Sequence, residues 1–237
     1  MLGNTNSIKV VASIPCLDEE QYIGNIVAEA LKHVDKVFVI DDGSSDSTAD
    51  VARSAGAEVI SHATRRGAGA ATRSGFEAAI KLGADIVVTL DGDGQHNAAE
   101  IPLLLQPLLQ GNADLIIGSR FINHKTNIPA YRKLGVDFIT WMYNLGSKVK
   151  VTDAQSGFRA HSRKLLESVA ITHDDFSFSV EVLVKARKKG FRIEEVPISC
   201  LYHDQGSTSD PLTHGFSVVM AVIGIRLSNV LFDRSKK

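Results

Sequence analysis

Short runs of apolar residues recur along the first half of the chain, at positions 8–14, 37–40, 58–61, 86–90 and 115–117. Elsewhere apolar residues return at helical spacing, which predicts helices over 20–34, 47–55, 68–82, 98–110, 131–149 and 179–189. Apolar runs of this length, alternating with helices, are typical of buried strands in a parallel sheet. The pattern therefore predicts an α/β fold in which helices flank a mostly parallel sheet.

The alternation weakens after Gly118. We expect one domain over residues 1–237, with residues 8–118 as the regular scaffold and residues 119–214 as an elaboration on it. Segment 215–232 is strongly apolar but is interrupted by Arg226, Ser228 and Asn229, which predicts a helix lying at a membrane interface rather than crossing the bilayer. Packing of this segment on the protein's own core or on a second copy is the alternative.

The composition fits a globular protein. Of 237 residues, 44% are hydrophobic and 22% charged, which excludes a disordered chain. The net charge of −1 gives no argument for nucleic acid as a partner. Cys16 and Cys200 form no metal-binding or disulfide pattern, and residues 1–7 do not resemble a signal peptide. We therefore expect a protein of the cytoplasm, either soluble or bound to the cytoplasmic face of a membrane.

An acidic turn, Asp91-Gly92-Asp93-Gly94-Gln95-His96, follows the apolar run 86–90 directly. In open parallel sheets, ligands bind at the carboxyl ends of the strands. Two carboxylates one residue apart, with the neutral oxygen of Gln95, suit Mg²⁺ or Mn²⁺, and a phosphate substrate would fill the remaining coordination positions. An acidic turn held only by its own hydrogen bonds is the alternative.

Other charged residues also lie after predicted strands or near predicted helix starts. Asp41 and Asp42 follow the run 37–40, where a carboxylate can bind the base or ribose of a nucleotide or simply cap the next helix. Arg66 precedes a predicted helix start, which favours an anion site. Three arginines of the second half could together hold a phosphate, although each alone is typical of a protein surface: Arg120, Arg132 and Arg159.

Five ordered segments carry a resemblance to a known family. They are Ser13-Ile14-Pro15-Cys16-Leu17-Asp18-Glu19-Glu20, Asp41-Asp42-Gly43-Ser44-Ser45-Asp46, Asp91-Gly92-Asp93-Gly94-Gln95-His96, Gly118-Ser119-Arg120-Phe121 and Asp153-Ala154-Gln155-Ser156-Gly157-Phe158-Arg159. In this order they resemble family 2 glycosyltransferases, in particular the dolichyl-phosphate mannose synthase group. The resemblance spans roughly residues 8 to 200.

The resemblance implies a Rossmann-like GT-A fold and an inverting, metal-dependent transfer of a hexose from a nucleotide-diphosphate sugar to a polyprenyl phosphate such as dolichyl phosphate. It assigns the nucleotide sugar to Pro15, Leu17, Glu19, Ile40, Asp42, Arg66, Asp91, Gly92 and Asp93, and the metal, Mg²⁺ or Mn²⁺, to Asp91, Asp93 and Gln95. The acceptor phosphate would contact Arg120, Arg132 and Arg159, and the residues closest to catalysis would be Asp93, Arg120 and Arg132.

Two questions stay open at the level of sequence. GDP-mannose is the donor that the resemblance favours, with UDP-glucose and UDP-N-acetylglucosamine as alternatives. A lipid phosphate is already anionic and needs no general base, whereas a hydroxyl acceptor would need a carboxylate, for which Asp153 is the nearest candidate. A non-catalytic subunit that binds nucleotide sugars is the remaining alternative. The oligomeric state stays open, with a homo-oligomer as one option.

Overall fold

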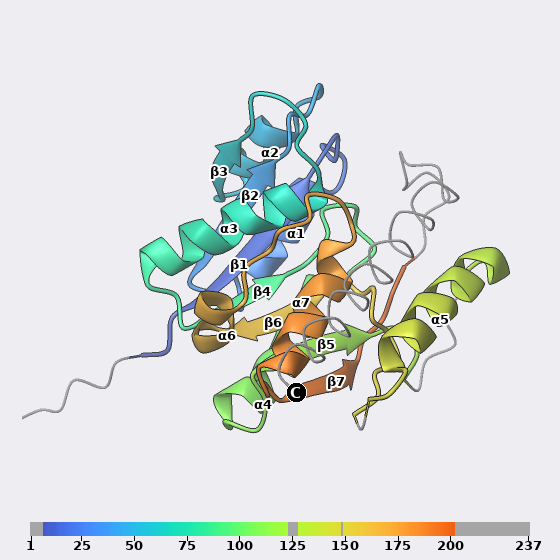
Figure 1. Ribbon diagram of the computed structural model, residues 1–237. Helices are drawn as coiled ribbons and strands as arrows, with labels where there is room; N and C mark the ends of the chain where they lie inside the picture. Colours follow the sequence, from blue (N-terminus) through green and yellow to red (C-terminus); the bar gives the residue numbers. More distant parts are fainter. Residues whose placement is uncertain (1–6, 123–127, 148, 202–237) are drawn as a thin grey trace, which may run out of the picture.

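The computed structural model of the protein describes residues 7–122, 128–147 and 149–201 (Figure 1). Its strands are β1 (Val10–Cys16), β2 (Lys36–Asp41), β3 (Glu58–Ser61), β4 (Ile86–Thr89), β5 (Leu115–Ser119), β6 (Arg159–Ser162) and β7 (Ile193–Pro197). Its helices are α1 (Ile23–Ala30), α2 (Thr48–Ser54), α3 (Ala68–Leu82), α4 (Ile101–Leu109), preceded by the short 3₁₀ turn η1 (Ala98–Glu100), α5 (Ala130–Asn144), α6 (Arg163–Ser168) and α7 (Phe178–Lys188).

All seven strands form one sheet in the order β3-β2-β1-β4-β6-β5-β7. Each neighbouring pair is parallel except for the two pairs made by β6, which runs antiparallel to β4 and β5. The predicted mostly parallel α/β sheet is therefore confirmed. From β1 the chain continues to β2 and β3 on one side of the sheet, and β4 then lies on the other side of β1. The strand order therefore reverses between β1 and β4, and open α/β sheets bind ligands at such a switch point.

Helices cover both faces of the sheet (Figure 1). Alternate strand residues point to opposite faces, so Val11 and Val87 pack with α3, α6 and α7, whereas Ala12 and Val88 pack with α1, α2 and α4. The central strands are buried on both sides, which explains why they read as continuous apolar runs rather than as alternating ones.

The five predicted strands are present, but β6, β7 and α6 were not predicted. The strand β6 has the sequence Arg-Ala-His-Ser, and the polar side chains of Arg159 and His161 are nevertheless buried. The predicted helix over 20–34 is shorter, because α1 begins at Ile23 and ends at Ala30. The predicted helix over 131–149 ends at Asn144, just before Gly146 adopts a positive φ. The segment 215–232 lies outside the described residues.

Within the described ranges, no helix combines the length and the hydropathy that a bilayer crossing requires.

Candidate active site

Acidic loops meet at the carboxyl edge of the sheet. The loop after β1 carries Leu17–Glu20, the loop after β2 begins at Asp42, and the acidic turn follows β4. Because β1 lies between β2 and β4, the three loops are neighbours. Their charges interact: burial raises the pKa of Glu19 to about 7, and repulsion from Asp93 adds to the shift. A cation bound at this edge would relieve that repulsion.

The turn after β4 is held by its own hydrogen bonds. The backbone N–H of Gln95 donates to Asp93 Oδ1 over 3.0 Å, and the side-chain Nε2 of Gln95 donates to Asp93 Oδ2 over 2.7 Å. The backbone N–H of Asp91 donates to Nδ1 of buried His96 over 3.3 Å. Burial lowers the pKa of His96 to about 4, so its ring is neutral at pH 7 and can accept this bond.

The Asp91 carboxylate is partly exposed and lies against Gly157. Its side chain is 45% exposed. A Cβ on Gly157 would lie 2.4 Å from Asp91 Oδ1 and 2.5 Å from Oδ2, so a side chain at position 157 would force this carboxylate to shift. Enclosure by the surrounding protein raises the pKa of Asp91 and of Asp93, and Asp91 repels Asp93 further, whereas Arg120 and Arg159 partly offset the shift at Asp91.

These residues fit a hard divalent cation. Carboxylate and amide oxygens are the ligands that Mg²⁺ and Mn²⁺ prefer, and Asp91, Asp93 and Gln95 supply them from one turn. Nowhere in the described part of the chain do three His, Cys, Asp or Glu side chains converge as a metal cluster. From the described residues the acidic turn therefore supplies two carboxylates, and substrate oxygens would complete the coordination.

Asp42 is buried and fixes the loop before α3. Its Oδ1 accepts from His62 Nδ1 over 2.7 Å and from the Arg66 N–H over 2.9 Å, and its Oδ2 accepts from the Gly67 N–H over 2.7 Å. His62 Nε2 lies 3.0 Å from the hydroxyl of Ser74. Sequence reasoning missed His62, because this residue lies 20 positions from Asp42 in no recognisable motif. Arg66 itself is exposed beside the site.

The residues predicted to surround the nucleoside differ in how far their side chains are exposed to a ligand. Pro15 pairs with Ile40 across β1 and β2, and both stand at the carboxyl ends of these strands. Leu17 is half-buried. The side chain of Ile40 is fully buried in the core, which corrects the expectation that it surrounds a ligand: only its main chain can do so. Asp18, which follows Leu17 in the loop after β1, has a φ of 56°, a left-handed conformation that Asp tolerates better than most residues.

Gly92 lets the acidic turn approach β1. A Cβ at this position would lie 2.4 Å from the Sγ of Cys16. The thiol is buried, and burial raises the pKa of Cys16, with repulsion from Glu19 adding to the effect. Cys16 is therefore a packing residue under the turn.

Arg120 stands at the end of β5 in a fixed orientation. Its Nε donates to Asp153 Oδ2 over 2.6 Å and its Nη2 donates to Asp153 Oδ1 over 2.8 Å, which is a bidentate ion pair. Asp153 is fully buried. This geometry disfavours Asp153 as the general base for a hydroxyl acceptor, because both of its oxygens are engaged and no substrate can reach them.

The other two arginines of the predicted phosphate cradle have different positions. Arg159 is 3% exposed and donates to the carbonyls of Ala154 and Ser179, which corrects the expectation of a side chain on a phosphate-facing surface. Burial lowers its pKa to about 10, and it is still cationic at pH 7. Its charge acts on Asp91 from inside the fold. Arg132 lies in the first turn of α5, and its side chain lies outside what the structure describes.

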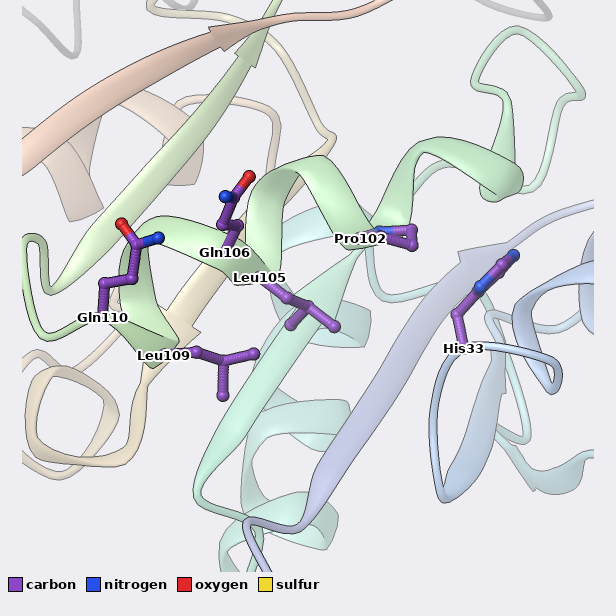
Figure 2. Close-up of a pocket in the computed structure, with 6 residues that line it drawn as sticks. All are labelled: His33, Pro102, Leu105, Gln106, Leu109 and Gln110. Atoms are coloured by element: carbon purple, nitrogen blue, oxygen red, sulfur yellow. The ribbon is translucent and has the colours of Figure 1, made fainter.

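A groove elsewhere on the molecule takes no part in this site. It is lined by His33, Pro102, Leu105, Gln106, Leu109 and Gln110, and Figure 2 shows His33 on a different segment from the other five. His33 precedes β2 and Gln110 precedes β5, so these parts of the groove lie at the amino ends of the strands. The acidic loops lie at the opposite, carboxyl ends.

Comparisons with known proteins show the family of the chain. The family model described as glycosyl transferase family 2 matches residues 12–183, and the chain belongs to this family. It is thus a glycosyltransferase enzyme with the predicted GT-A fold. The chain is 32% identical over 244 residues to the UDP-N-acetylglucosamine–dolichyl-phosphate N-acetylglucosaminyltransferase of Methanococcus voltae, covering 92% of this chain and 96% of the relative.

Two further comparisons extend the picture. The chain is 32% identical over 186 residues to the undecaprenyl-phosphate mannosyltransferase of Micrococcus luteus, covering 73% of this chain and 74% of that protein. Its fold is similar to the crystal structure of glucosyl-3-phosphoglycerate synthase from Mycobacterium tuberculosis in complex with Mn²⁺, UDP-glucose and phosphoglyceric acid. That comparison has a TM-score of 0.73 at 21% identity and covers 92% of this chain and 79% of the other.

Proposed function

We propose that this glycosyltransferase moves a hexose from a nucleotide-diphosphate sugar to a polyprenyl phosphate, with inversion at the anomeric carbon. The observation that carries the proposal is the placement of the acidic turn at the β1/β4 switch point, with the fixed cation of Arg120 interacting with Asp91. The relatives named for dolichyl and undecaprenyl phosphate support the acceptor class.

On the donor side, Asp91, Asp93 and Gln95 would hold Mg²⁺ or Mn²⁺, which offsets the charge that builds on the leaving nucleoside diphosphate. The loops after β1 and β2 would hold the nucleoside, with Glu19 as a polar side chain at this place. Asp42 is buried and both of its oxygens are engaged, so its part would be to order the loop rather than to contact the nucleoside. Asp42 fixes the Arg66–Gly67 backbone at the start of α3, which supports the proposal that Arg66 contacts the diphosphate.

On the acceptor side, Arg120 would orient the lipid phosphate behind the anomeric carbon. Positioning is the main task here, because the phosphate is anionic at neutral pH and attacks without losing a proton. Since Asp153 is locked in the Arg120 ion pair, the described site agrees better with an anionic acceptor than with a hydroxyl acceptor that depends on Asp153. Arg132, at the start of α5, is the second proposed contact to this phosphate.

The membrane is the natural location of such an acceptor, and we propose a peripheral contact through segment 215–232. Helix α5 also exposes apolar side chains on one side, including Leu134, Phe138 and Trp141. The rings of Phe138 and Trp141 stack with their centroids 5.9 Å apart.

The test is a transfer assay with the full chain. Radiolabelled GDP-mannose, UDP-glucose and UDP-N-acetylglucosamine are offered in turn with Mn²⁺ and with dolichyl phosphate in detergent. Label that moves into the organic phase, and that depends on the lipid phosphate, supports the proposal. Transfer only to soluble sugar or protein hydroxyls contradicts the acceptor class, and donor binding without any transfer would indicate a non-catalytic subunit.

A further inference from the structure

The carboxylate of Glu195, which lies outside the five segments that resemble the family, holds the turn that carries Asp153. Glu195 on β7 accepts three hydrogen bonds from this turn. Its Oε2 accepts from the Thr152 N–H over 2.7 Å and from the Thr152 hydroxyl over 3.0 Å, and its Oε1 accepts from the Asp153 N–H over 3.0 Å. Two backbone donors and one hydroxyl of the 152–153 turn are therefore tied to a strand some forty residues later in the chain.

The same turn is tied to Arg120 from the other side. Asp153 accepts from Arg120 Nε and Nη2 in the bidentate pair described above, and its Oδ2 also lies 3.3 Å from the Arg120 backbone N–H. The Thr152 hydroxyl lies 2.6 Å from the hydroxyl of Ser119, the last residue of β5. A continuous set of hydrogen bonds thus runs from Glu195 through Thr152 and Asp153 to Arg120.

Strand register explains why Glu195 reaches the turn. In the parallel pair of β5 and β7, Ile117 lies opposite Glu195, and β7 lies beside β5 at the edge of the sheet (Figure 1). Successive strand residues point to opposite faces, so Glu195 faces the turn whereas Glu194 is exposed on the other face. Burial raises the pKa of Glu195, and the N–H donors of Thr152 and Asp153 oppose that shift.

We propose that Glu195 is a positioning residue for Arg120. It fixes the 152–153 turn, and the Asp153 carboxylate on that turn fixes the plane of the Arg120 guanidinium. This inference rests on the proposed function, in which Arg120 receives the acceptor phosphate. Glu195 itself touches neither substrate. A guanidinium that moves by an ångström aligns a phosphate poorly, so a loosened turn weakens acceptor use while the donor site is unaffected.

Steady-state kinetics of Glu195→Gln, with Glu194→Gln as the matched control from the same strand, test the proposal. The amide cannot accept all three hydrogen bonds, because one of its two terminal atoms is a donor. We expect the KM for dolichyl phosphate to rise about tenfold in Glu195→Gln, with the KM for the nucleotide sugar unchanged, and both constants to stay at the wild-type values in Glu194→Gln. Equal changes in both KM values would overturn the positioning role.

A double-mutant cycle asks whether Glu195 acts through Arg120. In an Arg120→Ala background, Glu195→Gln should change the KM for dolichyl phosphate by less than about twofold, because the guanidinium that Glu195 positions is gone. The same tenfold effect in both backgrounds would overturn the proposal. If Glu195→Gln does not fold, Thr152→Val removes only the hydroxyl contacts of the turn, and we expect a smaller rise in the acceptor KM in the same direction.

A substrate-free measurement keeps this inference separate from the proposed function. An Arg Nε–H that donates to a buried carboxylate exchanges slowly with water, so the Arg120 Nε–H signal can be followed by ¹⁵N NMR in the full chain. Faster exchange in Glu195→Gln than in Glu194→Gln supports the positioning role, and equal exchange overturns it. A wild-type protein that transfers no sugar to lipid phosphate would refute the proposed function, and the NMR comparison would still decide the role of Glu195.

Discussion

Replacing Glu181 with Gln is expected to destabilise the fold at neutral pH and much less at low pH. Glu181 lies in the first turn of α7 and is fully buried. Its Oε1 accepts from Lys185 Nζ over 2.6 Å, and its oxygens also accept from the backbone N–H groups of Thr172 and His173. The adjoining Asp174 carbonyl receives the Gly69 N–H, so the carboxylate holds the 172–174 loop against the start of α3.

The magnitude follows from the pKa. Burial alone raises the pKa of Glu181, but the hydrogen bonds from Lys185 and Thr172 outweigh burial and lower it from 4.5 to about 2. At about 1.4 kcal/mol per pKa unit, the ionised carboxylate contributes about 3 kcal/mol to the free energy of unfolding at pH 7. Because the folded-state pKa is depressed, this contribution is complete above the unfolded-state pKa of 4.5 and is lost as pH falls toward 2. About 1.4 kcal/mol of it remains at pH 3.

Urea unfolding followed by far-UV circular dichroism measures the effect. We expect Glu181→Gln to lower the free energy of unfolding by about 2–3 kcal/mol at pH 7, since the amide retains some of the hydrogen bonds, and by about 1 kcal/mol at pH 3. Glu77→Gln, which neutralises an exposed carboxylate of α3, is the matched control and should change it by less than about 0.5 kcal/mol. A loss that is the same at both pH values, or no loss at pH 7, would refute the reasoning.

Three further predictions concern the site and the membrane. Asp93→Asn should reduce Mn²⁺-dependent transfer at least about a hundredfold without lowering the Tm, and full activity in that variant would remove Asp93 from the metal site. Gly157→Ala should weaken Mn²⁺ binding, measured by calorimetry, because its Cβ would meet the Asp91 carboxylate; wild-type affinity would show that Asp91 does not need this space. A chain truncated before Gly215 should no longer float with liposomes containing dolichyl phosphate, and undiminished flotation would assign the membrane contact to another surface.

The sequence predicted five of the seven described strands, because strands that are buried on both faces of a parallel sheet consist of continuous apolar runs. It missed β6 because Arg159 and His161 are polar residues that the fold buries. The carbonyls of Ala154 and Ser179 receive the Arg159 guanidinium, and the ring of Phe76 packs edge-on against His161. The sequence pattern cannot show that these contacts offset the burial of Arg159 and His161, because the contacting residues belong to other segments of the chain.

The candidate site divides in the same way. Asp91, Asp93 and Gln95 could be recognised because they lie within one turn of the chain, next to a strand. Neither the support of Asp42 by His62 nor that of Asp153 by Glu195 could be recognised, because each joins residues that only the tertiary structure brings together. For Arg159 the sequence showed the charge but not its burial, which depends on the packing of β6 under α7.

The central claim is that Asp91 and Asp93 hold a divalent cation against the diphosphate of a nucleotide sugar. A crystal structure of the full chain grown with Mn²⁺ and UDP-N-acetylglucosamine tests it most directly, with the anomalous signal of manganese locating the ion. We predict an anomalous peak within about 2.2 Å of carboxylate oxygens from this turn and of both phosphates. Bound nucleotide sugar whose diphosphate lies away from an ion-free turn would contradict the account.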